Sequence, residues 1–292
     1  MTAPIPSLSD RHPTCTVAAL ALHPVKSCAG IDLREALLVE TGLEFDRAWM
    51  VVDEHGEMFT QRELPCMALI QPTLRHSDVV LRAPGMLALH LRLDTVEEPS
   101  RVRVWDDVVK AYDMGALAAQ WFSDFLGRKL KLARFDPEEQ RLSDPKWAGT
   151  VTAENQFADG FPLLVANSSS LAELNGRLGA KGAAPVTMQR FRPNLVLDGL
   201  QPWDEDHIDA LEIDTGSGLV RLKLVKPCTR CTVPNVDPAT GVATNEPGDT
   251  LAGFRADPRM DGALTFGMNA VVLSGVEHTL RRGQALRATW AF

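Results

Sequence analysis

Short strand-like runs dominate this sequence, and only two segments have the spacing of a helix. The runs are apolar and are bounded by turn residues, which is typical of strands. They cover residues 17–23, 35–40, 49–53, 58–61, 78–82, 87–93, 102–112, 194–197, 210–213, 219–225, 270–273 and 284–290. Many short strands with few helices predict a β-rich α+β protein, built from two β-barrel-like domains with a few packed helices.

The two expected helices lie in different parts of the chain. Residues 115–126 place apolar side chains on one side at helical spacing, and Gly127 follows as a natural stop. Ser170-Leu171-Ala172-Glu173 matches a capping box, which predicts a helix that runs to about Arg177.

A connecting segment separates two expected domains. Residues 136–158 are charged, contain two prolines and show no clear period. We therefore expect an N-terminal domain over residues 14–135 and a second domain over residues 159–292. A chain of 292 residues is long enough for two domains with substantial cores.

Composition excludes several classes of protein. The net charge of −8 argues against a nucleic-acid binder. The sequence contains no run of eighteen or more apolar residues, so no transmembrane helix is expected. Residues 1–13 lack the pattern of a secretory signal. The odd number of cysteines, five, does not suggest a disulfide framework. We therefore expect a cytoplasmic protein with free thiols that binds neither nucleic acid nor a membrane.

Four short segments carry residues suited to chemistry. They are Pro24 to Gly30, Asp46 to Trp49, Arg190 to Asn194, and Lys226 to Cys231 with its extension Val236 to Gly241. In the last segment, Cys228 and Cys231 flank Arg230 at the end of an expected strand. A neighbouring guanidinium favours the thiolate, and thiolate is a soft ligand for a soft, redox-active metal.

The cysteine pair by itself leaves other interpretations open. A structural zinc site needs four ligands, yet the chain has no second cysteine pair and its histidines are scattered. A thioredoxin-like redox pair needs a helix start after it, which Pro234 and Pro238 disfavour. Both cysteines would also serve as small buried packing residues, although Arg230 between them argues against that.

Five cations lie in loops or at segment ends: Lys26, Arg47, Arg190, Arg192 and Arg230. Each one alone is typical of a solvated surface residue. Ser27 and Gly30, however, flank Lys26 as small residues that let backbone N–H groups approach an anion. Arg190 and Arg192 alternate around an aromatic residue, a pattern suited to bidentate recognition of phosphate. The residues themselves therefore predict a thiolate metal centre and an anion pocket.

Taken together, the four segments resemble the MOSC family, named for the C-terminal part of molybdenum cofactor sulfurases. Segments 24–28 and 46–49 resemble the β-barrel domain that precedes MOSC, and segments 191–194 and 228–231 resemble MOSC itself. The resemblance covers nearly the whole chain in the expected order. Within this family the segments are similar to those of the mitochondrial amidoxime-reducing component and the bacterial N-hydroxylated-base reductases.

The resemblance implies a molybdenum cofactor, in which a phosphorylated pyranopterin holds the metal and one protein cysteine completes its sulfur ligation. By motif position that metal ligand and catalytic residue is Cys231, with Cys228 as the alternative. The expected cofactor contacts are Lys26, Ser27, Arg47, Arg190, Arg192, Asn194, Thr229 and Arg230. Asp237 is the second expected catalytic residue, orienting substrate or handling a proton; the alternative is a turn residue before Pro238.

The implied function is that of a molybdenum-dependent oxidoreductase, which removes oxygen from small N-hydroxylated or N-oxide compounds. No ferredoxin-like cluster of four cysteines is present, so electrons are expected from a separate partner such as a ferredoxin or a flavin reductase. The alternative is a non-catalytic carrier of the molybdenum cofactor or a sulfur-transfer module. The absence of a pyridoxal-phosphate domain argues against a full cofactor sulfurase.

Overall fold

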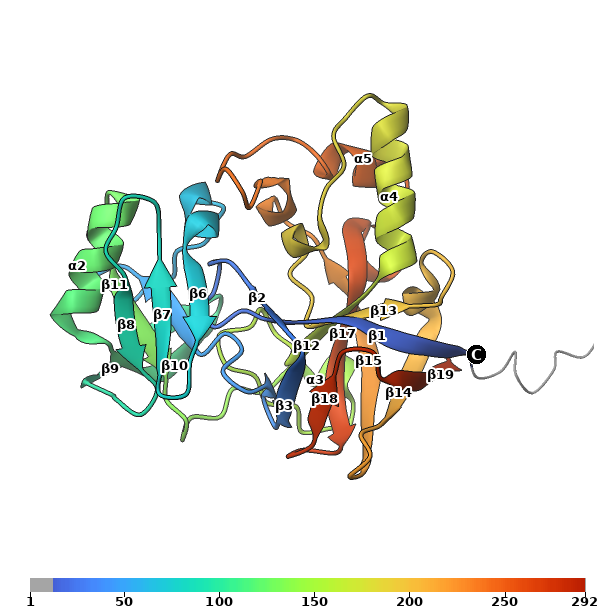
Figure 1. The fold of residues 1–292 in the computed structure, drawn as a ribbon, viewed down its shortest axis with the longest axis horizontal. Coiled ribbons are helices and arrows are strands. Elements are labelled where there is room, and N and C mark those ends of the chain that lie inside the picture. The colour runs from blue at the N-terminus through green and yellow to red at the C-terminus, as the bar shows by residue number, and fades with distance from the viewer. Residues whose placement is uncertain (1–12, 292) are drawn as a thin grey trace, which may run out of the picture.

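The computed structural model describes residues 13–291, which form two β-rich halves lying side by side (Figure 1). The predicted β-rich fold class is confirmed, since strands make up 40% of the described residues and helices 19%. The expectation placed on residues 1–12 lies outside the described residues. In the described part of the chain, no helix combines the length and the apolar character needed to cross a membrane.

One half is a closed barrel of seven strands. In ring order these are β12 (Leu163–Asn167), β13 (Leu195–Asp198), β1 (Thr14–Leu22), β19 (Ala285–Trp290), β14 (Ile208–Asp214), β15 (Leu219–Thr229) and β17 (Ala263–Ser274). A second pairing of β12, with β17, closes the ring. Fully buried aliphatic side chains such as Val17, Leu197 and Leu222 fill the interior, so the barrel is a packed core.

The other half contains two antiparallel sheets and a helix. One sheet has the order β5 (Trp49–Val52), β11 (Lys131–Phe135), β10 (Asp107–Asp113) and β9 (Glu98–Val104), and the other β6 (Gln71–Leu74), β7 (Asp78–Arg82) and β8 (Leu89–Arg92). The predicted helix is confirmed as α2 (Gly115–Leu126), which buries Trp121 and Phe122 against this core. It ends at Gly127, whose left-handed backbone (φ 68°) glycine adopts without steric cost.

Smaller elements complete the fold. The remaining strands are β2 (Ile31–Leu33), β3 (Glu35–Val39), β4 (Gly42–Leu43), β16 (Ala256–Asp257) and β18 (Thr279–Arg281). The remaining α-helices are α3 (Pro145–Ala148), α4 (Ser168–Ala180) and α5 (Gly248–Ala252). The 3-10 helices are η1 (Pro65–Leu69), η2 (Met188–Arg190), η3 (Asp204–His207), η4 (Val233–Asn235) and η5 (Pro258–Met260).

Several expected boundaries differ from the structure. The strand expected at 270–273 is the longer β17, and residues 58–61 form no named strand but only a bridge between Met58 and Val52. Residues 102–112 are a β9–β10 hairpin and not one strand, because Trp105 (φ 56°) and Asp106 form its turn. Strand β15 continues past Val225 to Thr229, since its pairing with β17 persists. Helix α4 begins before the expected capping box, because the Asn167 side chain accepts a hydrogen bond from the Ser169 N–H.

The first strand connects the two halves. Although it comes first in the chain, β1 pairs with β13 and β19 inside the barrel formed mostly by the second half of the sequence. Figure 1 shows it as the long blue strand that begins at the right-hand side and ends between the two halves. The chain then leaves the barrel at Lys26, so the two halves meet close to that residue. The division into domains at 14–135, 136–158 and 159–292 stays a prediction.

Candidate functional site

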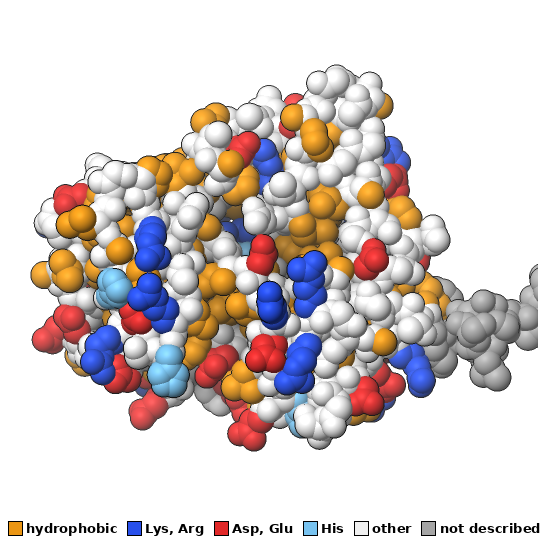
Figure 2. All heavy atoms as spheres, viewed as in Figure 1, with side chains coloured by type: hydrophobic (Ala, Val, Ile, Leu, Met, Phe, Trp, Pro, Cys, Tyr) orange, Lys and Arg blue, Asp and Glu red, His pale blue; other side chains and the backbone are white. Residues whose placement is uncertain are grey.

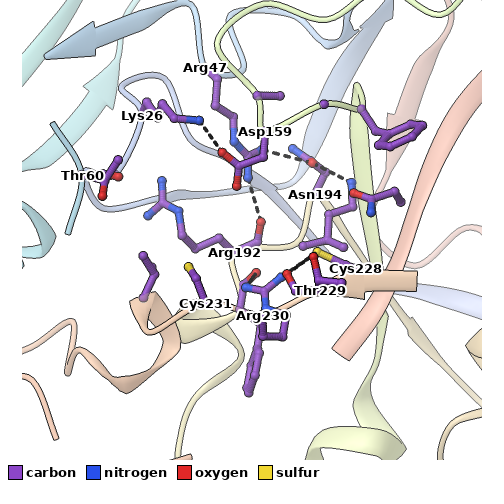
Figure 3. A pocket seen from close by; sticks show the side chains of 18 of the residues that line it. Lys26, Arg47, Thr60, Asp159, Arg192, Asn194, Cys228, Thr229, Arg230 and Cys231 are labelled. Carbon is purple, nitrogen blue, oxygen red and sulfur yellow. Dashed lines mark hydrogen bonds and ion pairs between the residues drawn. The ribbon is translucent and has the colours of Figure 1, made fainter. Parts of the chain in front are cut away.

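A cavity, here called the first cavity, opens between the two halves. It collects segments far apart in sequence: the chain after β1, the turn before β5, the tip of the β9–β10 hairpin and the end of β15 (Figure 3). The charged side chains that line it are five cations and one carboxylate: Lys26, Arg47, Arg62, Arg192, Arg230 and Asp159. This surplus of positive charge suits an anionic ligand even though the whole protein is acidic.

Eight of the ten predicted site residues line the first cavity: Lys26, Ser27, Arg47, Arg192, Asn194, Thr229, Arg230 and Cys231. The structure therefore brings together residues from all four sequence segments. It does not bring in Arg190, which lines a neighbouring cavity, or Asp237, which lies in a turn. The assignment of these residues to a cofactor stays a prediction.

Strained backbone is concentrated around the first cavity. Ser27, Arg47, Trp105 and Arg192 line it, and all four have left-handed φ angles between 51° and 66°. This region is costly for residues other than glycine, and such residues cluster at functional sites. At Ser27, a hydrogen bond from the Gln61 amide to the carbonyl oxygen (2.6 Å) helps to hold this conformation.

Lys26 is positioned where β1 has ended and the chain crosses β5. Its backbone N–H donates to the carbonyl of Trp49 (2.7 Å), and its Nζ donates to the carbonyl of Phe157 (2.7 Å) and to Oδ1 of Asp159 (2.5 Å). Only 6% of Lys26 is exposed. Burial lowers the pKa of Lys26, while the Asp159 carboxylate opposes that shift.

Arg47 joins the two halves through its guanidinium. Nη1 pairs with the buried carboxylate of Asp46 and donates to Oδ1 of Asn194 (3.1 Å), and Nη2 donates to the carbonyl of Arg192 (2.9 Å). Asp46 in turn accepts the backbone N–H of His23 (2.8 Å). Arg47 is therefore held in one orientation, with its charge only partly compensated by Asp46.

Arg192 follows the 3-10 helix η2 and turns back toward the first half of the chain. Its Nη1 donates to the carbonyl of Cys28, and its buried Nη2 has no hydrogen-bond partner among residues 13–291. Burial, with a smaller contribution from nearby Arg47, lowers the pKa of Arg192 to about 10. A buried guanidinium nitrogen without a partner is costly, and an anionic ligand would relieve that cost.

Cys228 sits at an irregularity at the end of β15. The register of β15 against β17 shifts between Pro227 and Thr229, and such a bulge redirects the side chain within it. Arg230 then donates from Nη1 to the Cys228 sulfur (2.9 Å) and from Nη2 to the carbonyl of Phe191 (2.9 Å). Its Nε is buried without a partner in the described part of the chain.

Cys231 differs from Cys228 because it is exposed and follows the end of the strand (Figure 3). Both thiols line the first cavity. A zinc centre gains no support, because the described residues contain no group of three or more His, Cys, Asp or Glu side chains placed to hold a metal ion. A further thiol, Cys28, lies nearby but is fully buried, and burial raises its pKa to about 12.

Sequence reasoning missed Asp159 and Trp105. Asp159 accepts hydrogen bonds from Lys26 and from the Trp105 indole (3.2 Å), and the Trp105 ring stacks with Arg62 at 4.4 Å. Buried Arg141 fixes the segment before Asp159 by donating to the carbonyls of 156 and 158. The Trp-Asp-Asp run at 105–107 was a usable turn signal, whereas nothing in the sequence distinguishes Asp159 from other loop carboxylates.

Asp237 and Arg190 form a pair outside the first cavity. Oδ1 of Asp237 accepts the backbone N–H of Ala239 (2.8 Å), while its Oδ2 lies 3.3 Å from Nη2 of Arg190. The Asp237 carbonyl also accepts the N–H of Gly241 (2.8 Å). These contacts are those of a turn residue, which was the alternative interpretation of Asp237.

Comparisons with known domains cover most of the chain. Residues 14–129 match the MOSC N-terminal beta barrel domain, and residues 152–287 match the MOSC domain. The resemblance inferred from the four segments is therefore confirmed.

The similar proteins are of two kinds: amidoxime reducing components and a molybdenum cofactor sulfurase. Human mitochondrial amidoxime reducing component 2 is 35% identical over 254 residues, which cover 83% of this chain and 73% of the relative. Human mitochondrial amidoxime-reducing component 1 matches with the same identity and coverage. Human molybdenum cofactor sulfurase is 30% identical over 243 residues, but these cover 77% of this chain and only 27% of that protein.

These relatives correct one expectation. The prediction of a cytoplasmic protein is wrong by this comparison, because the amidoxime reducing components from human and macaque are mitochondrial by name. The prediction was based on the absence of a secretory signal and on an odd number of cysteines. Both features concern secretion only, and neither distinguishes one reducing compartment from another.

Proposed function

Since the chain belongs to the MOSC family, we propose that it holds a molybdenum cofactor in the first cavity and reduces N-hydroxylated or N-oxide compounds there. The electrons come from a separate redox protein. The observation that carries this proposal is the convergence of eight predicted residues from four distant segments on one positively charged cavity.

The chemistry of the cavity fits the anionic part of such a cofactor. The cations that line it outnumber the single lining carboxylate, Asp159. Two buried guanidinium nitrogens, Nη2 of Arg192 and Nε of Arg230, have no partner within the described chain. Guanidinium groups bind phosphate through paired, charge-assisted hydrogen bonds. In our proposal Lys26, Arg47, Arg192 and Arg230 hold the phosphate and the pterin.

The two thiols have different parts in this proposal. Cys231 is exposed at the cavity, which leaves its sulfur free to become the metal ligand. Cys228 is held by the Arg230 guanidinium and supports the wall behind the ligand. Soft thiolate sulfur suits a soft metal. When bound, the cofactor supplies two-electron oxygen-atom chemistry.

The remaining residues position these groups. Asn194 and Asp46 fix Arg47, and Ser27 and Thr229 present small polar side chains to the cavity. Asp159 is the carboxylate that lines the cavity within reach of a ligand. Its Oδ1 accepts a hydrogen bond from Nζ of Lys26. The roles given to Asp237 and Arg190 stay predictions, since both residues lie outside the first cavity.

The proposal is tested on protein made in a host that synthesises the cofactor. Metal content and pterin content are measured first, and a dye-reduced sample is then assayed with benzamidoxime. We expect stoichiometric molybdenum and turnover above that of free cofactor. Cys66→Ala is the control for Cys231→Ala, because Cys66 is a partly buried thiol that lies outside the cavity lining.

The outcomes separate the alternatives. Molybdenum without turnover would favour the cofactor carrier or sulfur-transfer module. Absence of molybdenum from properly loaded protein would refute both interpretations. Loss of metal in Cys66→Ala would show that removing a thiol outside the first cavity also prevents metal binding. Metal loss in a cysteine variant would then no longer support a metal ligand in that cavity.

A further inference from the structure

A second cavity lies next to the first one, at the seam between the two halves. It has a volume of 340 Å³, within the range of about 300–1,000 Å³ that is usual for small-molecule pockets. One wall comes from residues 29–31, η1 and β6, and the other from η2 and the chain after η4. Figure 2 shows the surface hollowed between the two halves, with Lys or Arg side chains inside the hollow.

The charge of the second cavity is positive. Arg190 and Arg192 line it, and no carboxylate does so within the described residues. Exposed Gln71, Thr73 and Gln189 add neutral hydrogen-bonding groups. Such a lining provides charged donors together with groups that donate or accept, which is how proteins recognise small oxyanions.

Arg190 is built into this wall. Its side chain is only 11% exposed, and its Nη1 is anchored on the carbonyl of Pro234 (3.2 Å). Burial lowers the pKa of Arg190, while Asp237 opposes that shift. Asp237 is 37% exposed and is not part of the lining, but its Oδ2 lies 3.3 Å from Nη2 of Arg190. This carboxylate compensates part of the Arg190 charge, and with Arg192 beside it the second cavity keeps a net positive charge.

Arg192 supplies the second cation. It lines both cavities, and its Nη1 contact with the Cys28 carbonyl places the guanidinium beside residues 29–30, which belong to the second cavity. Its buried Nη2 lacks a partner in the described chain. Two arginines that converge on one hollow from the same segment form a built site for an anion.

We propose that the second cavity binds a small oxyanion, the phosphate or carboxylate group of a small molecule, between Arg190 and Arg192. Arg190 gives this site its specificity, because it lines the second cavity and not the first. The site shares Arg192 with the first cavity, whereas Arg190 belongs to the second cavity alone, so the site is tested by direct binding and not by turnover.

The test measures binding of inorganic phosphate and of acetate to the full chain by calorimetry, and the site by NMR. Two variants separate the cavities. Arg190→Gln alters only the second cavity, and Lys26→Gln alters only the first. Because the first cavity also suits anions, we expect two phosphate-binding events on the cofactor-free chain: Arg190→Gln weakens one of them at least tenfold and leaves the other, and Lys26→Gln does the opposite. The phosphate arm and the acetate arm show which of the two anions the site prefers.

A third variant guards against misfolding. Gln189→Glu adds a carboxylate at an exposed position of the lining, where the fold tolerates it, and should weaken binding of both probes. If Lys26→Gln weakened every binding event and Arg190→Gln weakened none, the anion would belong to the first cavity alone and the proposal would be overturned. Failure of both probes to bind the unaltered protein at 100-fold molar excess would overturn it as well.

Discussion

The Nζ of Lys26 lies 2.5 Å from Oδ1 of Asp159, yet the two side chains differ sharply in exposure: 7% for Lys26 and 77% for Asp159. A buried ammonium group is thus neutralised by a carboxylate on the open surface of the first cavity. Partial loss of solvation at the protein surface acts to raise the pKa of Asp159, but the attraction of Lys26 and then of Arg47 outweighs it, so this pKa lies well below its usual range. The carboxylate therefore occupies a place that the anion of a ligand would otherwise take.

Removing this charge should strengthen binding of anions. In Asp159→Asn, Lys26 loses its carboxylate partner, and the first cavity loses its only lining carboxylate among the described residues. We expect inorganic pyrophosphate to bind the cofactor-free protein about three- to tenfold more tightly, because a carboxylate this exposed is well screened by water and offers only about 1 kcal/mol of competition. Isothermal titration calorimetry measures the change.

The control for this prediction is Asp94→Asn. Asp94 is also an exposed carboxylate, 68% accessible and paired with Arg92, but it lies outside the first cavity. Unchanged pyrophosphate affinity is expected there. Weaker binding in Asp159→Asn would show that the carboxylate organises the cations and does not compete with the anion.

The thiols are expected to respond differently to substitution. Cys231→Ala should abolish metal retention and activity while changing stability by no more than about 0.5 kcal/mol, because the residue is exposed. Cys228→Ala should be milder in its effect on metal, although Arg230 loses a partner. Molybdenum analysis and thermal denaturation of both variants give the answer. Equal metal loss in both, or loss in Cys228→Ala alone, would reverse the assignment of the ligand.

The sequence indicated which residues form the site better than it indicated how they are arranged. Ser27, Arg47 and Arg192 were expected near one another from short motifs, because such motifs carry the residue types that an anion needs. Their left-handed backbone could not be anticipated, since none of them is a glycine. Asp159 was missed because its role depends on Lys26, 133 positions away, and no local pattern encodes that distance.

Helix α2 was predicted to the residue because its apolar positions recur at helical spacing and Gly127 ends it. Strand β7 was also predicted to the residue, although its three central residues are all buried, because Asp78 and Arg82 bound a short apolar run. Strand β12 was missed: all five of its residues are buried, and a short apolar run of that kind has no periodicity. The β9–β10 turn was missed although Asp106 and Asp107 signal a turn, because Trp105 favours strands and is an unusual residue in a left-handed turn position.

Asn194 should couple stability to the first cavity. Its Oδ1 accepts the buried backbone N–H of Leu164 (3.0 Å) and Nη1 of Arg47 (3.1 Å). Asn194→Ala leaves that N–H without a partner, which costs about 2–3 kcal/mol of unfolding free energy. It also frees Arg47, so affinity for pyrophosphate should fall. Urea denaturation and calorimetry follow the two effects.

Asn175→Ala is the matched control for Asn194. Asn175 also makes two hydrogen bonds with its amide group, both to the backbone of Val186, but it lies away from the first cavity. Stability should fall while pyrophosphate affinity stays the same. If Asn194→Ala lowered stability and left affinity untouched, Asn194 would be a purely structural residue.

Glu205 should make stability depend on pH. It is fully buried, with Oε2 accepting from Ser170 (2.7 Å) and Asn167 (3.1 Å), and burial raises its pKa from 4.5 to about 7. Between these values the unfolded chain loses the proton first, so stability falls as pH rises from about 4.5 to about 7, by up to about 3 kcal/mol.

Buried His23, with its lowered pKa, acts in the opposite direction. The comparison must therefore be with Glu205→Gln, which keeps the acceptor oxygen and should lose this fall, becoming more stable than the unaltered protein at pH 8. Parallel pH profiles in urea denaturation would mean that Glu205 is ionised in the folded protein throughout.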